Sequence, residues 1–591
     1  MRPFIVTDIE AGKLPRWGLL LLCVLYVAPG FVGRDPWRTD DAAGFGIALT
    51  MARGGAADWL MPNIAGDAMP GQGPLPFWIA GAFAKLGVPW SADALLTEHL
   101  MVRLATALLL AATLSLVWYA SFSLARRPGV QPSDPFGASA GSIDFARAIA
   151  DSVLLVLMAS FGLIFRMHET TGDVAQLTWV AAFLFGCALA LERPGRGGAI
   201  AGAAIAATLL TRGLPLAIAL LAALVALPLL VREFRLVAAR LLRSALPVAL
   251  LGMLAWPLAL LAGDDAARAH LAAWLAAQAH AASGPTLEGI AYFVQTTPWF
   301  YWPAWPVATW AIWRWRGRWA EPAVALPILA AAAFSAQALI APSGAEGRLL
   351  PAAAPLALLA GMGLPTLRRG IVSLIDWFAV TSFTLFGIAI WAWWIALMTG
   401  FPPRMAYRAS RLAPGFEPSW IVIDIVLGGL ATVAWLALVR WRISRRPRMI
   451  WRAMALSCGG LVLAWFLLMT LWLPVFNERN TYRDVAIGLG AALAAAPHDC
   501  VATRNLGSAQ RASFLYFAGP RFGPTVGAMP DEGAAAAGDR ASCGWLLVQD
   551  TGPIAQTRTS PLAGAELAWE GQRRAERGER FRLYRLRSPG R

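Results

Sequence analysis

Charged residues suited to catalysis or phosphate binding gather in three short segments beside apolar runs. The first segment, residues 34–41, contains two adjacent carboxylates, Asp40 and Asp41, and the other two span residues 166–173 and 346–351. A carboxylate in such a place can take a proton from a nucleophile, and an arginine can hold two oxygens of a phosphate. Because charge is costly beside hydrocarbon, these segments are the default candidates for a functional site.

The elements that must position these segments are membrane-spanning helices. Of the 591 residues, 58% are hydrophobic and only 14% are charged. The apolar residues fall in runs of roughly 17–25, the length of helix that crosses the hydrocarbon layer. The sequence therefore predicts an α-helical polytopic membrane protein with about thirteen transmembrane helices. The runs cover residues 17–33, 98–124, 149–165, 174–191, 198–212, 213–231, 244–262, 299–313, 322–341, 350–367, 372–399, 420–440 and 453–475.

The positive charge indicates how these helices are oriented. The net charge is +15, and since only two lysines occur, arginine supplies nearly all of it. The arginines cluster after every second apolar run, as the positive-inside rule expects of cytoplasmic loops. This favours topological anchors over a nucleic-acid partner and predicts a cytoplasmic N-terminus in a bacterial inner membrane. The arginines concerned are Arg126, Arg127, Arg147, Arg193, Arg196, Arg232, Arg235, Arg240, Arg243, Arg314, Arg316, Arg318, Arg368, Arg369, Arg440, Arg442, Arg445, Arg446, Arg448 and Arg452.

Two segments on the opposite, periplasmic side are too long to be connectors. Residues 34–97 contain amphipathic stretches at 41–52 and 77–86, which are expected to lie along the membrane surface. After residue 476 the long apolar runs stop, and a helix at 482–496 with strands at 500–505, 544–549 and 580–587 is predicted. We expect a transmembrane catalytic domain over residues 1–476 and a small periplasmic α/β domain over 477–591. If this domain is periplasmic, Cys500 and Cys543 can form a disulfide.

Family resemblance appears in the same loop. The segments Trp37-Arg-Thr-Asp40-Asp41, Asp58-Trp-Leu-Met-Pro62 and Gln72-Gly-Pro-Leu-Pro-Phe-Trp78 resemble the first periplasmic loop of the aminoarabinose-transferase and protein-O-mannosyltransferase superfamily. Thr211-Arg212-Gly213 and Arg348-Leu-Leu-Pro351 are similar to two further segments of that superfamily. The resemblance implies a GT-C fold and an inverting glycosyltransferase that uses a polyprenyl-phosphate sugar.

The sequence departs from the superfamily pattern at two places. The usual Asp-Glu pair is here Asp40-Asp41, and the lysine of the usual Glu-Lys-Pro-Pro is replaced by Gln72. A glutamine can donate a hydrogen bond to a phosphate but brings no charge, so another cation must compensate or the donor must differ.

Roles follow from the resemblance and from the chemistry of each side chain. Asp40 aligns with the catalytic acid of the superfamily, and Asp41 and Asp173 are further catalytic candidates. Capping of a helix is the structural alternative for all three. The donor phosphate is expected to bind Arg348, Arg34, Arg166, Arg212 and Gln72, and an interfacial anchor is the alternative for Arg348. Arg38, Trp37, Glu169 and His168 are expected to line the substrate cavity.

Cofactor motifs are missing from the sequence. No phosphate loop, His-Glu-x-x-His motif or Cys-x-x-Cys pair occurs. His168 and Glu169 are two adjacent metal-ligand types, but a solvated loop is the simpler reading, and we expect no metal site.

The function expected from these observations is transfer of a sugar, such as 4-amino-4-deoxy-L-arabinose or a hexose, from undecaprenyl phosphate. The acceptor is expected to be lipid A, another envelope glycan or a protein at the periplasmic face. A flippase or transporter of lipid-linked sugars is an alternative, because it also needs many helices and arginines. A non-catalytic relative that acts in envelope assembly is another, and Gln72 is the feature that keeps it open.

Overall fold

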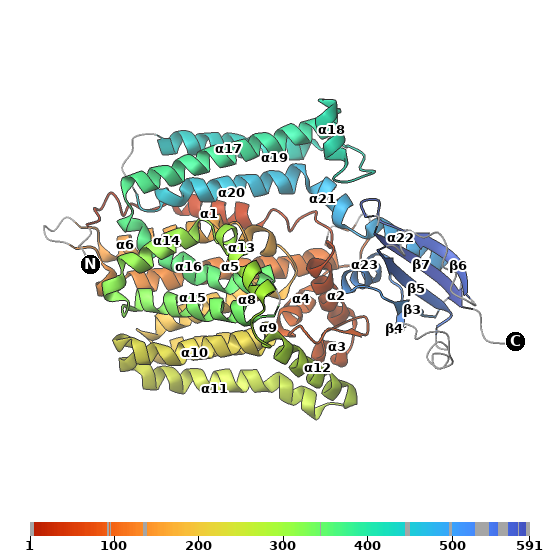
Figure 1. The fold of residues 1–591 in the computed structure, drawn as a ribbon, viewed down its shortest axis with the longest axis horizontal. Helices are drawn as coiled ribbons and strands as arrows, with labels where there is room; N and C mark the ends of the chain where they lie inside the picture. The colour runs from red at the N-terminus through yellow and green to blue at the C-terminus, as the bar shows by residue number, and fades with distance from the viewer. Residues whose placement is uncertain are drawn as a thin grey trace.

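The computed structural model places most of the chain in one helical bundle and one sheet domain (Figure 1). It describes residues 5–91, 94, 96–133, 139–342, 344–443, 449–495, 499–525, 543–552, 565–576 and 578–586. Three of the predicted anchor arginines, Arg445, Arg446 and Arg448, lie outside the described residues.

Each of the thirteen predicted apolar runs contains or overlaps a helix of the bundle. The helices lie side by side along the long axis of the molecule (Figure 1). Among the described residues, eight are long and apolar enough to cross a membrane: α5, α8, α11, α15, α16 with its 3-10 extension, α17, α19 and α20. A polytopic membrane protein is thus confirmed, and the count of thirteen spans stays a prediction. The bundle helices are α1 (Arg16–Val27), α5 (Glu98–Ala125), α6 (Ser142–Ala159), α8 (Gly172–Ala190), α9 (Pro194–Arg212), α10 (Leu214–Leu230), α11 (Arg232–Ala262), α14 (Ala304–Arg314), α15 (Pro322–Ile340), α16 (Glu346–Gly363), α17 (Arg369–Thr399), α19 (Val422–Ile443) and α20 (Arg452–Leu471).

The arginine-rich connections meet at the end of the bundle that holds the N-terminus (Figure 1). Arg126 pairs with Glu192 at 2.5 Å, which joins the connection after α5 to the one after α8. The Arg318 guanidinium donates to the Gly129 carbonyl at 3.2 Å. One end of the bundle is therefore basic, and the sheet domain lies at the other end.

Short helices and a two-stranded β1–β2 ribbon fill the end of the bundle next to the sheet domain. We expected residues 41–52 to lie along the membrane surface, and this is wrong for α2. Every residue from Asp41 to Met51 is buried, because α2 packs between α4 and α23 of the sheet domain. The short elements of the bundle are α2 (Asp40–Arg53), α3 (Ala56–Leu60), β1 (Asn63–Ile64), β2 (Asp67–Ala68), α4 (Leu75–Ala84), η1 (Pro128–Val130), α7 (Leu163–Arg166), α12 (Asp265–Ala281), α13 (Leu287–Phe300), η2 (Arg316–Arg318), η3 (Leu364–Thr366), α18 (Pro403–Ser410) and α21 (Leu473–Asn480).

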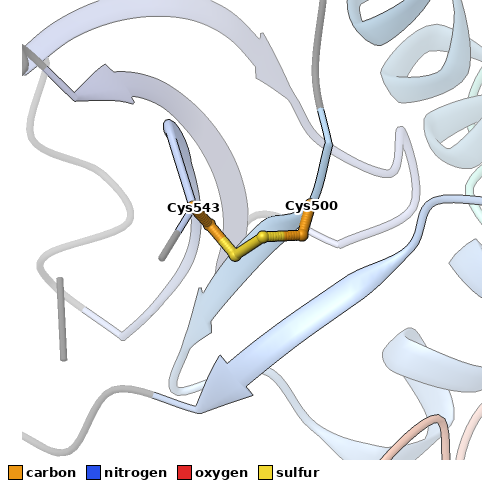
Figure 2. Close-up of a disulfide and its surroundings, with 2 residues drawn as sticks. All are labelled: Cys500 and Cys543. Atoms are coloured by element: carbon orange, nitrogen blue, oxygen red, sulfur yellow. A yellow bond between two sulfur atoms is a disulfide. The ribbon is translucent and has the colours of Figure 1, made fainter. Parts of the chain in front are cut away.

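The C-terminal domain is a five-stranded mixed sheet with the strand order β4-β3-β5-β7-β6. Strand β3 pairs in parallel with β4 and β5, whereas β7 pairs antiparallel with β5 and β6. The predicted helix and the three predicted strands are found as α22, β3, β5 and β7. Cys500 and Cys543, whose pairing the sequence left open, form a disulfide, with their Cα atoms 5.2 Å apart (Figure 2). The elements are α22 (Arg483–Ala494), β3 (Val501–Arg504), α23 (Ser508–Phe517), β4 (Phe522–Thr525), β5 (Trp545–Thr551), β6 (Ala565–Gly571) and β7 (Glu579–Leu586).

Candidate active site

The two adjacent carboxylates open helix α2 at the end of the bundle next to the sheet domain. Thr39 precedes them with φ 76° and ψ −134°, a backbone conformation that L-residues rarely adopt, and its side chain does not cap the helix. Asp40 and Asp41 therefore occupy the first turn, where the helix dipole favours negative charge. Consecutive residues of a helix point in different directions, so the two carboxylates have different surroundings.

Asp41 is buried, and both of its oxygens are engaged. Oδ2 accepts hydrogen bonds from Arg103 at 2.8 Å, from Arg34 at 3.2 Å and from the Trp37 backbone at 3.1 Å. Oδ1 accepts one from the Thr170 backbone at 2.7 Å. Burial opposes ionisation of Asp41, but the charges of Arg103 and Arg34 outweigh it and hold the pKa of this carboxyl well below its usual range. Asp41 thus stays ionised and inaccessible.

Arg103 is the residue that sequence reasoning missed. It lies on α5 with a fully buried side chain and donates to the carbonyls of Gly30, Asp35 and His168 as well as to Asp41. It therefore ties the end of α1, the start of α2 and the loop after α7 together. A signal existed in the sequence, since Arg103 is a lone arginine inside the apolar run 98–124, where an unpaired charge would be costly.

Asp40 is the accessible carboxylate of the pair, with 67% of its side chain exposed. Its Oδ2 lies 3.2 Å from a guanidinium nitrogen of Arg166. Arg212 also lies within electrostatic range of Asp40, of Arg166 and of Arg348. The structure therefore brings four predicted site residues from four separate elements into one group, in which Arg166 pairs with Asp40 and Arg212 lies within range of both and of Arg348.

Arg212 is held in place by the ends of α8 and α9. It forms an ion pair with Asp173, which is buried in the first turn of α8. Gly213 then ends α9 with φ 86°, and any Cβ there would collide with Gln278, so glycine is required. Asp173 is thus the ion-pair partner of Arg212, and the catalytic role expected for it stays a prediction.

Gln72 lies in the loop that packs against the end of α9. The Gly73 backbone donates to the Thr211 carbonyl at 3.3 Å, and a Cβ at Gly73 would collide with the Leu210 carbonyl. Gln72 is therefore one residue from a direct contact with the segment that carries Arg212. The uncharged Gln72 thus lies beside the end of α9, which carries the cation Arg212.

Arg166 joins the exposed carboxylate to two further acids. Its guanidinium lies 2.9 Å from Glu169 and 3.0 Å from Glu346. Burial opposes the charge of Arg166, but Glu169 and Glu346 outweigh it and raise the pKa of this guanidinium. Burial raises the pKa of Glu169 to about 7 although Arg166 opposes the shift. Glu169 is therefore a group that changes charge near neutral pH beside the Arg166–Asp40 pair.

Three other predicted site residues are buried away from the exposed carboxylate. Arg34 is 3% exposed, and its guanidinium lies 3.8 Å from the centroid of the Trp37 ring. Trp37 is buried, and its indole donates to Asn477 at 2.9 Å. His168 is buried too, with its ring nitrogens 2.6 and 2.8 Å from the carbonyl oxygens of Ile164 and Tyr26. The expected solvated loop at His168 is therefore wrong, because its ring is buried against the rings of Tyr26, Phe31 and Trp465.

The remaining predicted residue, Arg38, faces the sheet domain. It pairs with Glu576 at 3.3 Å, and its backbone donates to the Asn480 carbonyl. Arg38 and Thr39 line a cleft of about 340 Å³ whose other walls come from the sheet domain, including Tyr482, Gln510 and Glu579. Among the described residues, no group of three or more His, Cys, Asp or Glu side chains could hold a metal ion.

Comparison with known proteins places the fold. No protein-family model matches the chain, and no curated protein matches it in sequence. The crystal structure of ArnT from Cupriavidus metallidurans bound to undecaprenyl phosphate is similar, with a TM-score of 0.67 at 14% identity over 96% of this chain and 97% of that one. ArnT from the same organism in the apo state gives 0.65 at 15% identity, over 96% and 98%.

A third solved structure, the apo oligosaccharyltransferase of Archaeoglobus fulgidus, has a TM-score of 0.41 at 11% identity, covering 85% of this chain and 63% of that one. The likeness to ArnT extends over nearly the whole of both chains, bundle and sheet domain together. The ArnT-like fold expected from the loop motifs is thereby confirmed.

Proposed function

We propose that this protein is a glycosyltransferase that takes a sugar from undecaprenyl phosphate and passes it to an acceptor at the periplasmic face. The observation that carries the proposal is the exposed carboxylate of Asp40, which faces Arg166 and Arg212 while its neighbour Asp41 is locked in the interior. The ArnT fold supports it, and an ArnT structure contains undecaprenyl phosphate. The basic end of the bundle would then face the cytoplasm.

The transfer needs one bond made and one broken at the anomeric carbon of the sugar. An acceptor oxygen attacks this carbon from the face opposite the phosphate, and the carbon–oxygen bond to the phosphate breaks with its electron pair leaving on undecaprenyl phosphate. If the acceptor is a hydroxyl, Asp40 takes its proton; if it is an ionised phosphate, Asp40 only orients it. This displacement inverts the configuration of the sugar.

The leaving phosphate would be stabilised by Arg212 and Arg348, with Arg166 next to them. Arginines placed where negative charge develops lower the barrier, and the planar guanidinium can bind two phosphate oxygens. Gln72 would donate a hydrogen bond without adding charge. Arg212, whose segment contacts the loop of Gln72, would bind the phosphate beside this hydrogen bond.

Arg34, Asp41 and Arg103 would position the site rather than contact substrate. All three side chains are buried, and both arginines pair with Asp41, so a bound sugar has no access to them. Asp173 would act likewise through Arg212. We place the acceptor in the cleft between Arg38 and the sheet domain, because Thr39 lines it and Asp40 follows directly.

The rival functions lead to different expectations. A flippase of lipid-linked sugars needs no exposed carboxylate at Asp40, and the same holds for a non-catalytic relative. Neither explains why an exposed acid should face a group of arginines at the end of the bundle next to the sheet domain. We therefore rank transfer first.

The test uses mass spectrometry of lipid A and of total envelope glycans from deletion and complemented strains. Wild type and Asp265→Asn should restore a defined sugar on one acceptor, whereas Asp40→Asn should not. Asp265 is the matched control, because it is a fully exposed carboxylate on α12. Full restoration by Asp40→Asn at equal protein levels would refute the proposal. Unchanged glycans, with an undecaprenyl-linked sugar accumulating in the deletion strain, would favour the flippase.

A further inference from the structure

A long groove runs along the membrane-spanning surface between α1, α5 and α6, away from the candidate active site. Its volume is about 740 Å³, and most of its lining is apolar, including Leu19, Cys23, Leu114, Phe122 and Leu154. It extends from Arg16 to Ala28, the length of α1. Twelve helical residues span about 18 Å, close to the thickness of one hydrocarbon leaflet, about 15 Å.

The groove exists because α1 packs closely on one side only. At the end of α1, the Trp465 indole of α20 donates to the Pro29 carbonyl at 3.0 Å. On the side facing α5, Leu20 and Val24 line the groove and remain 64% and 58% exposed. In a membrane an acyl chain fills such a groove, because the chain makes van der Waals contacts with the apolar side chains that line it.

The charges at one end of the groove select the kind of lipid. Arg16 and Arg147 line this end, and the Arg16 guanidinium lies 4.9 Å from the centroid of the Trp118 ring. Two carboxylates lie near them: Asp151 accepts a hydrogen bond from the Trp118 indole at 2.8 Å, and Asp144, one helical turn before Arg147, pairs with Lys13 at 3.2 Å. Three cations, Arg16, Arg147 and Lys13, against these two carboxylates leave one positive charge, and the first turn of α1 adds its dipole.

We propose that this groove binds one anionic glycerophospholipid. Its phosphate would lie between Arg16 and Arg147, and an acyl chain would lie along α1 and α5. Basic pockets between helices at the arginine-rich side of a membrane protein are typical sites for anionic head groups. The inference does not depend on the proposed function.

Occupancy of the groove has a consequence at the far end of α1. There the Gly30 carbonyl accepts a hydrogen bond from Arg103. Arg34, four residues after Gly30, pairs with Asp41. A lipid that fills the groove therefore stabilises the helix that leads into the site loop.

The test measures lipid binding to the purified full chain by native mass spectrometry. Phosphatidylglycerol and phosphatidylcholine with the same acyl chains are titrated against wild type, Arg16→Ala/Arg147→Ala and the control Arg193→Ala/Arg196→Ala. The control arginines are exposed at the same basic end and outside the groove. Each arginine near a phosphate contributes about a factor of five, so the groove variant should bind phosphatidylglycerol about 30-fold more weakly. The groove variant should bind phosphatidylcholine as tightly as wild type does. The control variant should bind both lipids as tightly as wild type does.

Three outcomes would overturn the proposal: equal affinity of wild type for both lipids, unaltered binding by the groove variant, or an equal loss in the control variant. If the double variant does not fold, the single variant Arg147→Gln replaces it, with about a fivefold loss expected. The readout is binding rather than turnover, so it separates this proposal from that of glycosyl transfer.

Discussion

The same substitution, aspartate to asparagine, should change the stability of the protein at one of the two adjacent carboxylates of α2 and not at the other. Asp41→Asn removes the negative charge that lies between two buried arginines, Arg34 and Arg103, and leaves both without a counter-charge. Breaking a buried ion pair costs about 3–5 kcal/mol. Asp40→Asn removes an exposed pair with Arg166, and such pairs contribute about 0–1 kcal/mol. The difference in the free energy of unfolding between the two variants should be at least about 2 kcal/mol.

The assay is reversible unfolding of the purified protein in mixed micelles, with activity measured on the same samples. Asp41→Asn should lose stability and, through disorder of the loop, activity. Asp40→Asn should keep wild-type stability and lose activity alone. Equal stability of the two variants would refute the assignment of Asp41 to the buried network.

A double substitution separates lost pairing from lost packing. Arg103→Met alone leaves Asp41 with one arginine and should cost about 3–5 kcal/mol. Adding Asp41→Asn removes the carboxylate charge that Arg103→Met leaves partly unpaired. The free energy of unfolding should therefore fall less in the double variant than the two single-variant losses added together. Strict additivity would mean that Arg103 acts through its three carbonyl contacts and not through Asp41.

Two further predictions concern stability, and the first uses the same unfolding assay. The pKa of Glu169 is about 7 in the folded state and about 4.3 in the unfolded state, so the folded state binds the proton more tightly. Wild type should therefore lose stability as the pH rises from about 4.3 through 7. Glu169→Gln imitates the protonated form and should gain roughly 3 kcal/mol over wild type between pH 4 and pH 8; a pH-independent difference would contradict the raised pKa. Cys500 and Cys543 close a loop over a separation of 43 residues, so Cys500→Ser/Cys543→Ser should destabilise the sheet domain by about 4 kcal/mol. Limited proteolysis measures this, and a reductant should reproduce the effect in wild type and have none in the variant.

The helices of the bundle were predictable because span length is fixed by the membrane. A run of apolar residues is a local signal, and each of the thirteen runs contains or overlaps a helix. The buried position of α2 was not predictable, because its cover comes from α23, more than 450 residues further along the chain. Strand β6 was missed for a related reason. Most of its side chains are exposed or half-buried, so no alternation of apolar residues marks it.

The candidate site was predictable as a set of residues and not as a set of contacts. Resemblance picked out Asp40, Arg212 and Arg348, the charge of the outer loop picked out Arg166, and the structure brings them together from α2, α9, α16 and α7. Asp41 is buried and Asp40 is exposed because elements distant in the sequence cover only Asp41. The local sequence around the two residues does not show this difference. Arg103 was hidden by the hydrophobicity of its own run, since averaging over a span conceals a single charge.

The balance of charge around Asp40 gives a reason why a neutral Gln72 can serve. Arg166 and Arg212 pair with four carboxylates, Asp40, Glu169, Glu346 and Asp173, and Arg348 lies within electrostatic range of Arg212. Burial makes Glu169 the acid that gives up its charge most readily, with a pKa of about 7. An approaching phosphate would raise this pKa further, because like charges disfavour ionisation. Protonation of Glu169 would then remove one of the three acids that pair with Arg166, and the positive charge of Arg166 would act more strongly on the phosphate in place of the cation that position 72 lacks.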